Sequence, residues 1–395
     1  MASSAGSSRA RVPVVKPIAD GQAPLARLNA LTGLRWLAAF WVFSYHMQNL
    51  GSLPAPFDAP VRLGSLGVTF FFVLSGFVLT WSMRPSLRVS TFYTRRFARI
   101  WPSHIVALLL AVPVFYTLAQ PDHSWVKPFS LPILLLSVVL VQGFSRDPVV
   151  LFSGNPAAWT LSCEALFYAV HPWAGRLLRR ASRRASLVVA AVTIGVAFAY
   201  RLATHLGPAG WANGVPFPIE HLPEFILGMA IAWAFVQGWR PRIPAWSAWA
   251  VFVIVIGWLT VGPTKGIPVL SPVAAVFTNE FATVVCALLI VAVAGGTLLG
   301  RRSWLEHPIM VRLGDWSYAF YLVHATVIYA VLNVIGGPRG PGWSNLLWGG
   351  GIFLVALGLA AGLHHAVEVP AERGIRRWKD RRDRRAAALR LPADA

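Results

Sequence analysis

The chain has 395 residues, of which 56% are hydrophobic and only 13% are charged, and its mean hydropathy is +0.58. A soluble domain carries about 25% charged residues, so this composition excludes a soluble globular enzyme, a disordered chain and a disulfide scaffold. The formal net charge of +20 comes from basic residues in short stretches between apolar segments. Such stretches are typical of cytoplasmic loops that contact anionic lipid headgroups, and we therefore expect no nucleic-acid partner.

Three regions follow from this pattern. Residues 1–30 are rich in Ser, Ala, Pro and Arg and predict a disordered cytoplasmic arm, with no cleavable signal peptide. Residues 31–371 predict a membrane domain, and residues 372–395 a basic cytoplasmic tail.

Apolar stretches of span length recur along the membrane domain and predict an all-α, polytopic transmembrane helix bundle. The candidate spans are 31–50, 63–83, 101–120, 131–144, 158–175, 185–206, 219–238, 244–262, 272–298, 310–335 and 344–369.

The basic clusters predict the orientation of these spans. If all the clusters are cytoplasmic, each interval between two of them must contain an even number of spans. The interval 100–175 contains three candidates, so one of them does not cross. Either 131–144 is too short, at about 14 residues where about 20 are needed, or 158–175 is re-entrant. We expect about ten spans plus one partial or re-entrant segment, with both termini cytoplasmic, in a multi-pass protein of the cell membrane that contacts lipids.

The first span contains Arg35 and His46. They are eleven residues apart, which is about three helical turns, so they share a face and lie roughly 16 Å apart along the axis. Ionisable groups inside a span are costly and usually face a cavity. A snorkelling arginine and a structural histidine are the other interpretation.

Two further stretches combine polar and aromatic residues. Ser75 precedes a glycine in an aromatic helix, which suits either close helix packing or a site. Arg95, Arg96 and Arg99 lie on one side of a helix start at the membrane surface. Arginine there suits a phosphate-bearing ligand, because its planar fork makes bidentate charged hydrogen bonds, or it lies in a lipid-facing positive loop.

Polar residues also occur in the later spans. Glu164 and Tyr168 share a helix face and follow Trp159, and an acid in an apolar run must be paired or lie in a polar cavity. Tyr321 and His324 lie deep in a later span.

Taken in order, these stretches resemble the acyltransferase 3 family of bacterial integral membrane O-acyltransferases, over nearly all of residues 30–371. The sequence departs from the family pattern at Thr69 and Cys163, where an acid and an aliphatic residue are usual. The matching motifs are Gly-Leu-Arg35 to His46, Phe-Phe-Val-Leu-Ser75-Gly76, Arg95-Arg96 with Arg99 before Pro102, Trp159 with Ser162, Glu164 and Tyr168, Ser317-Tyr318 with Tyr321 and His324, and Glu368 before Pro370.

The resemblance implies transfer of an acyl group from acyl-CoA, a donor substrate, to a hydroxyl, with no permanently bound cofactor or metal. Family members modify cell-envelope polysaccharides, lipid-linked sugars or secreted natural products such as macrolides. Arg35 and His46 are the family's functional signature. The arginine-rich, alanine-rich composition indicates a high-GC genome, which favours a macrolide or similar acceptor over an envelope glycan.

The resemblance suggests a role for each candidate residue. His46 would be the general base, and Glu164 would orient the imidazole or the acceptor. Ser75 or Tyr168 would donate to the developing oxyanion. The predicted substrate-binding set is Arg35, Ser75, Arg95, Arg96, Arg99, Trp159, Tyr168, Tyr321 and His324.

Three alternatives stay open. The first is that the acceptor is a cell-envelope polysaccharide, which would make the protein a polysaccharide O-acetyltransferase. The second is that the reaction passes through a covalent acyl-His or acyl-Cys163 intermediate. The third is that the protein is a membrane transporter with a buried His/Glu relay, although we find no paired halves with matching broken segments.

Overall fold

A computed structural model describes residues 27–388 except 85–86, 122, 209 and 211–213. Of the predicted disordered arm, 1–30, residues 1–26 lie outside the described residues. The prediction is wrong for its last two residues, because Asn29 and Ala30 already belong to the first helix. The basic tail is described to residue 388.

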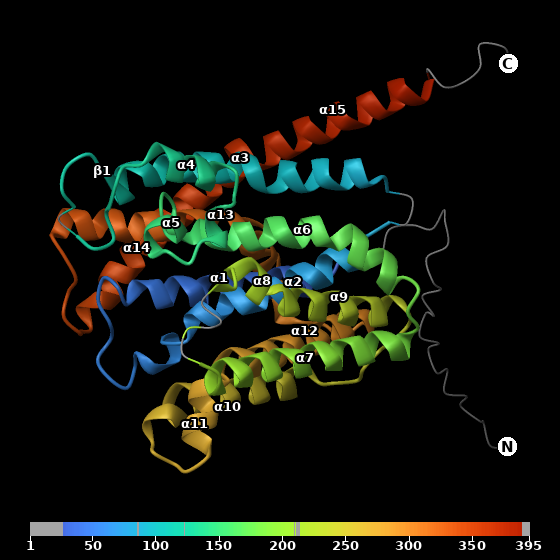
Figure 1. Cartoon of the computed structure of the whole chain (residues 1–395), viewed down its shortest axis with the longest axis horizontal. Helices are drawn as coiled ribbons and strands as arrows, with labels where there is room; N and C mark the ends of the chain where they lie inside the picture. Colours follow the sequence, from blue (N-terminus) through green and yellow to red (C-terminus); the bar gives the residue numbers. More distant parts are fainter. Residues whose placement is uncertain (1–26, 85–86, 122, 209, 211–213, 389–395) are drawn as a thin grey trace, which may run out of the picture.

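Long helices that alternate in direction build the molecule (Figure 1). The described residues contain almost no strand: β1 and β2 are two residues each and pair in parallel. The elements are α1 Asn29–Met47, α2 Gly67–Trp81, α3 Val89–Phe115, β1 Tyr116–Thr117, β2 Lys127–Pro128, α4 Leu131–Val138, α5 Pro148–Leu151, α6 Trp159–Leu178, α7 Arg183–Leu206, α8 Phe217–Glu220, α9 Leu222–Val236, α10 Ala245–Val261, α11 Leu270–Val276, α12 Thr278–Leu298, α13 Pro308–Ile335, α14 Ser344–Leu363 and α15 Val369–Ala388.

Eight helical stretches of the described residues are long and apolar enough to cross a membrane. They contain α2, α3, α7, α9, α10, α12, α13 and α14. The helices α1 and α6 have 19 and 20 residues but are less apolar, because they carry Arg35 and His46 in one case and Glu164 in the other. The two long helices that are not apolar enough to count as spans therefore carry the candidate catalytic residues. The predicted number of about ten spans stays a prediction.

The interval with three candidates is clarified by helix length. The helix α4 has eight residues, about 12 Å, which is too short to span a bilayer core. The helix α6 is continuous over 20 residues, about 30 Å. By length alone, α4 is too short to span and α6 is long enough. The helix α3 begins at Val89, twelve residues before the predicted span, so the arginines of that stretch are helical.

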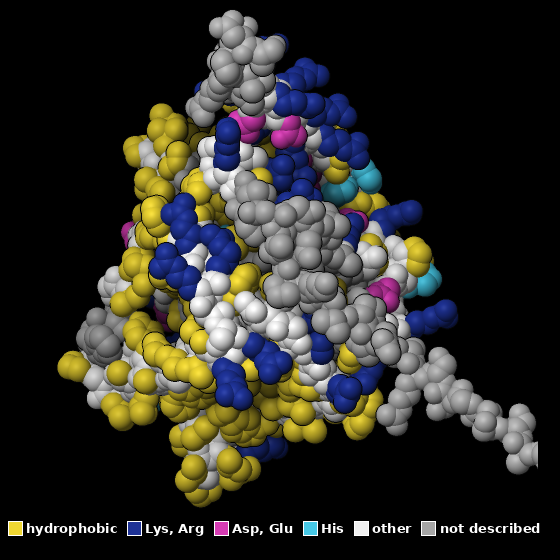
Figure 2. Space-filling model, turned by 90° about the vertical axis from the view of Figure 1, so that its right-hand side faces the viewer, with side chains coloured by type: hydrophobic (Ala, Val, Ile, Leu, Met, Phe, Trp, Pro, Cys, Tyr) yellow, Lys and Arg dark blue, Asp and Glu magenta, His cyan; other side chains and the backbone are white. Residues whose placement is uncertain are grey.

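Basic side chains gather at one end of the bundle. The α2–α3 and α6–α7 connections and α15 lie at this end (Figure 1), and Figure 2 views it directly, with dark-blue Lys and Arg side chains spread across it. At the opposite end Arg62 and Arg146 pair with the carboxylates of Asp58 and Glu220. These connections share one end of the bundle, and the cytoplasmic placement of that end stays a prediction.

The helices α2 and α9 pack with their backbones in contact. A Cβ at Gly76 would lie 2.0 Å from the carbonyl oxygen of Phe225, and one at Gly228 would lie 1.9 Å from that of Val73. Small residues at such a crossing allow an approach that no side chain would permit. This contact fixes α2, and with it Ser75, against the bundle core.

Candidate active site

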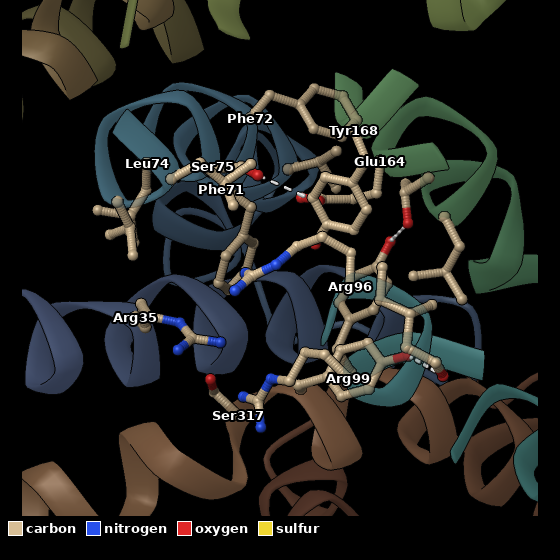
Figure 3. A pocket seen from close by; sticks show the side chains of 18 residues that line it. Arg35, Phe71, Phe72, Leu74, Ser75, Arg96, Arg99, Glu164, Tyr168 and Ser317 are labelled. Carbon is tan, nitrogen blue, oxygen red and sulfur yellow. Dashed lines mark hydrogen bonds between the residues drawn. The ribbon is translucent and has the colours of Figure 1, made fainter. Parts of the chain in front are cut away.

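A cavity of about 200 Å³ opens between α1, α2, α3, α6 and α13. Each of these helices contributes polar or aromatic side chains that point into it (Figure 3). We call it the arginine pocket. The residues that define it are Arg35, Phe71, Phe72, Ser75, Arg96, Arg99, Glu164, Tyr168, Ser317, Tyr318 and Tyr321.

One carboxylate and two uncompensated guanidinium groups face this pocket. Glu164 accepts a hydrogen bond from Ser75 Oγ at 3.0 Å. Arg96 lies 5.8 and 5.9 Å from the rings of Phe92 and Tyr168, and its buried Nε has no hydrogen-bond partner among the described residues. Within the same part of the chain, no hydrogen bond or ion pair holds the Arg35 guanidinium (Figure 3). Such a wall is suited to an anionic ligand.

The three arginines of α3 occupy three different environments. Arg99 pairs with the fully buried carboxylate of Glu368 and lies 3.6 Å from that of Glu372, so its charge is compensated within the protein. Arg95 does not line the arginine pocket. Of the predicted cluster, only Arg96 offers the pocket an uncompensated charge, and Arg35 supplies the second.

The two candidate histidines form a pair beside this pocket. The ring centroids of His46 and His324 lie 5.2 Å apart. His324 Nδ1 lies 2.8 Å from the carbonyl oxygen of Tyr321, while His46 Nδ1 and His324 Nε2 are buried without a partner among the described residues. The Tyr321 ring lies 5.6 Å from that of His324 and also lines the arginine pocket. Tyr321 therefore joins the histidine pair to the pocket.

The structure gives the surroundings of two further candidates, Glu164 and Trp159. Glu164 lies in the arginine pocket with Ser75, and no hydrogen bond between Glu164 and His46 occurs in the described residues, which favours its other predicted role, orienting the acceptor. Trp159 does not line the pocket but packs against Phe217 and His221, with centroids 5.3 and 5.8 Å apart. Apolar spans supply many aromatic residues, and sequence spacing does not tell packing rings from ligand contacts.

Cys163 lies in the packed core beside the arginine pocket, not in its wall. Its side chain is fully buried and packs in an aromatic core with Phe72 and Phe167, and it does not line the arginine pocket. This placement counts against a role for its thiol in a covalent intermediate.

The model of the family described as the acyltransferase domain of acyltransferase 3 proteins matches residues 28–365, most of the chain. The chain belongs to the acyltransferase 3 family. It is accordingly an acyltransferase, as the ordered motifs predicted, and this assignment decides against the transporter alternative. No solved structure matches the chain.

Three relatives illustrate the range of the family. The acyltransferase MdmB of Streptomyces mycarofaciens is 34% identical over 374 residues, 88% of this chain and 92% of that protein. Nodulation protein 10 of Rhizobium leguminosarum is 27% identical over 341 residues, 80% and 85% of the two chains. The exopolysaccharide production protein ExoZ of Rhizobium meliloti is 28% identical over 271 residues, 68% and 78% of the two chains.

The structure also contains a polar cluster that the sequence reasoning missed. Glu220, Glu224 and Glu280 come together with Arg146 and Arg201 at the ends of several spans. Each is a single charge at the edge of an apolar stretch. A signal was available in the number of acids close to span starts, but their convergence depends on the tertiary fold.

Proposed function

We propose that the protein is a membrane O-acyltransferase that moves an acyl group from acyl-CoA to a hydroxyl of a sugar or a secondary metabolite such as a macrolide. The observation that carries the proposal is the adjacency of the arginine pocket and the histidine pair through Tyr321. The arginine pocket is suited to bind an anionic acyl donor, and the histidine pair is suited to accept a proton. The basic end of the bundle, which we propose to be cytoplasmic together with both termini, is where CoA would approach.

The donor would reach the pocket along its guanidinium groups. CoA carries phosphates on a long thin arm that ends in the thioester. With a volume of about 200 Å³, the pocket holds one end of such a donor and not all of it. We assign Arg96 to the phosphates and Arg35 to the deeper part of the arm.

The transfer itself would use the free imidazole nitrogen of His46. The acceptor oxygen attacks the thioester carbonyl carbon while His46 takes the hydroxyl proton. The carbon–sulfur bond then breaks, and CoA leaves as a thiol after receiving that proton from the imidazole. The new ester stays on the acceptor. Hydroxyl donors of the pocket wall, such as Ser75, which now donates to Glu164, would stabilise the oxyanion after exchanging that partner.

Two classes of acceptor are candidates. The composition favours a high-GC source with a macrolide or similar acceptor, and the relative MdmB comes from a Streptomyces species. The relative named for exopolysaccharide production supports a cell-envelope polysaccharide as the second candidate.

The test uses the full-length protein purified into lipid nanodiscs. Thiol release from acetyl-CoA and longer acyl-CoA donors is followed with a macrolide or an exopolysaccharide oligosaccharide as acceptor, and mass spectrometry identifies the product. We expect thiol release that depends on one acceptor class, with a matching mass increase. A protein that consumes no thioester with either acceptor would contradict acyl-CoA-dependent transfer.

A further inference from the structure

A second polar cavity, with a volume of about 190 Å³, lies between α7, α8, α9 and α12. Glu220, Glu224, Glu280 and Arg201 line it, and most of the remaining wall is aliphatic. We call it the glutamate pocket. None of its residues belongs to the motifs that carry the family resemblance.

Two glutamates of this pocket each have one satisfied oxygen. Glu280 Oε1 accepts a hydrogen bond from Arg201 Nε at 3.0 Å. Glu224 Oε1 accepts one from Asn279 Nδ2 at 3.0 Å and lies 3.0 Å from His221 Nδ1. These contacts hold both carboxylates in place from one side.

The other oxygen of each carboxylate is unsatisfied. Glu224 and Glu280 are only 3% and 5% exposed, and their Oε2 atoms are buried without a hydrogen-bond partner among the described residues. An unpaired buried acceptor destabilises the protein, and more so when it is charged. Both glutamates line the pocket, so a small rotation of either side chain would let an occupant that donates hydrogen bonds satisfy these atoms. Water alone is the simplest such occupant.

The charge balance narrows the class of ligand. The three carboxylates are opposed by two guanidinium groups, because Arg146 and Arg201 both pair with Glu220 and Arg201 also pairs with Glu280. The third carboxylate, Glu224, has His221 as its neighbour, which adds a positive charge when it is protonated. The unpaired atoms of the wall are acceptors, which disfavours phosphate or another anion as the ligand. A sugar ring fits, since its hydroxyl or ammonium groups donate and its C–H faces suit an aliphatic wall.

The glutamate pocket is next to the arginine pocket. The ring of Phe72, which lines the arginine pocket, lies 5.0 Å from that of His221, which contacts Glu224. The side chains of Phe72 and His221 thus connect the two walls.

We propose that the glutamate pocket binds a sugar unit of the acceptor through hydrogen bonds from its hydroxyl or ammonium groups to Glu224 and Glu280. This inference rests on the proposed transfer to a sugar-bearing acceptor and names where that acceptor is recognised.

The test compares Glu224→Gln and Glu280→Gln with a matched control, Glu306→Gln, whose carboxylate lies in neither pocket and bonds to Thr297. Equilibrium binding of a macrolide that carries an amino sugar is measured on each purified protein in nanodiscs, together with the KM for acceptor and for acetyl-CoA. We expect both pocket variants to raise the macrolide Kd and the acceptor KM about tenfold. The KM for acetyl-CoA and acceptor-independent thioester hydrolysis should stay unchanged, as should all values for the control.

Two further measurements keep the result interpretable. Ala197→Phe fills the pocket without altering a charge, and it should also weaken macrolide binding even if a glutamate variant fails to fold. Methyl glucoside and its 2-amino analogue serve as competitors: competition by both assigns hydroxyl donors, and competition by the amine alone assigns an ammonium group.

Wild-type macrolide affinity in Glu224→Gln, Glu280→Gln and Ala197→Phe would overturn the proposal and leave a pocket that holds water only. If macrolide binding depends on these residues while the wild-type protein consumes no thioester, the site stands and the proposed reaction fails.

Discussion

The arginine pocket and the histidine pair are neighbours, but their surroundings are opposite. The pocket combines three guanidinium groups, a carboxylate and hydroxyls. The histidine pair is enclosed by aromatic rings, and Phe43 and Phe320 lie 6.4 and 6.0 Å from His324. Fixed positive charge holds an anion, whereas an imidazole in an apolar site stays neutral and can accept a proton. We therefore propose that donor binding and proton transfer fall to separate groups, and we expect that each can be removed without the other.

The largest effect is expected at the histidine pair. Replacing the proposed base, His46→Ala, should lower kcat about 10²–10⁴-fold and leave the donor KM almost unchanged. Added imidazole should restore part of the activity. The control is His365→Ala, at an exposed histidine. Near-wild-type turnover of the His46 variant would remove this residue from the mechanism.

An intermediate effect is expected in the arginine pocket. Arg96→Ala should raise the KM for acyl-CoA about tenfold or more, because a hydrogen bond to a charged group contributes about 1.5–3 kcal/mol. The loss should shrink with an acyl-pantetheine donor that lacks the nucleotide, and the preference among acyl chain lengths should not change.

Arg95→Ala is the matched control for this experiment, since its side chain lies on the same helix but outside the pocket. Its donor KM should stay close to wild type. Equal losses in the two arginine variants, or equal losses for full-length and truncated donors, would mean that these residues only bind lipid.

A smaller effect is expected at the boundary between the two regions. Tyr321→Phe removes a hydroxyl that accepts a hydrogen bond from Thr160 Oγ1 at 3.1 Å but keeps the ring beside His324. A single neutral hydrogen bond contributes about 1 kcal/mol, so kcat should fall about fivefold. A drop as large as that of the His46 variant would instead give this phenol a direct part in the reaction.

A labelling experiment, which needs no activity assay, tests which end of the bundle faces the outside of the cell. Cysteines are introduced at Ser90, at the basic end, and at Leu118, which is 93% exposed at the other end. The native Cys163 and Cys286 are buried. An impermeant maleimide added to intact cells should label the Leu118 variant and not the Ser90 variant. The reverse pattern would place donor entry on the outside.

Most of the long helices were predictable, because an apolar stretch of about 20 residues in lipid must satisfy its backbone within a helix. The structure at the end of the membrane domain was harder to predict. The polypeptide continues from α14 through a π-helical turn, His364–Glu368, into α15, which was predicted only as a tail. The helix α15 packs on α3, where the hydroxyl of Thr91 donates a hydrogen bond to the carboxylate of Asp383. Such docking depends on a partner surface far away in sequence.

The candidate residues were predictable as polar groups in apolar helices, but their partners were not. The pairs Arg99–Glu368 and Ser75–Glu164 span 269 and 89 residues. Local periodicity gives the face of one helix and says nothing about which helix lies opposite. For that reason the sequence left open whether Glu164 orients the His46 imidazole or the acceptor, and it did not predict the compensation of Arg99.

The close contact of α2 and α9 at Gly76 and Gly228 has a consequence for engineering the acceptor range. Any side chain at either position must push the two backbones apart, and Ser75 would move with α2. Random mutagenesis of this region would therefore yield many inactive variants that report helix spacing and not substrate choice. A library aimed at new acceptors should hold both glycines constant and diversify the side chains that line the cavities on either side of Phe72.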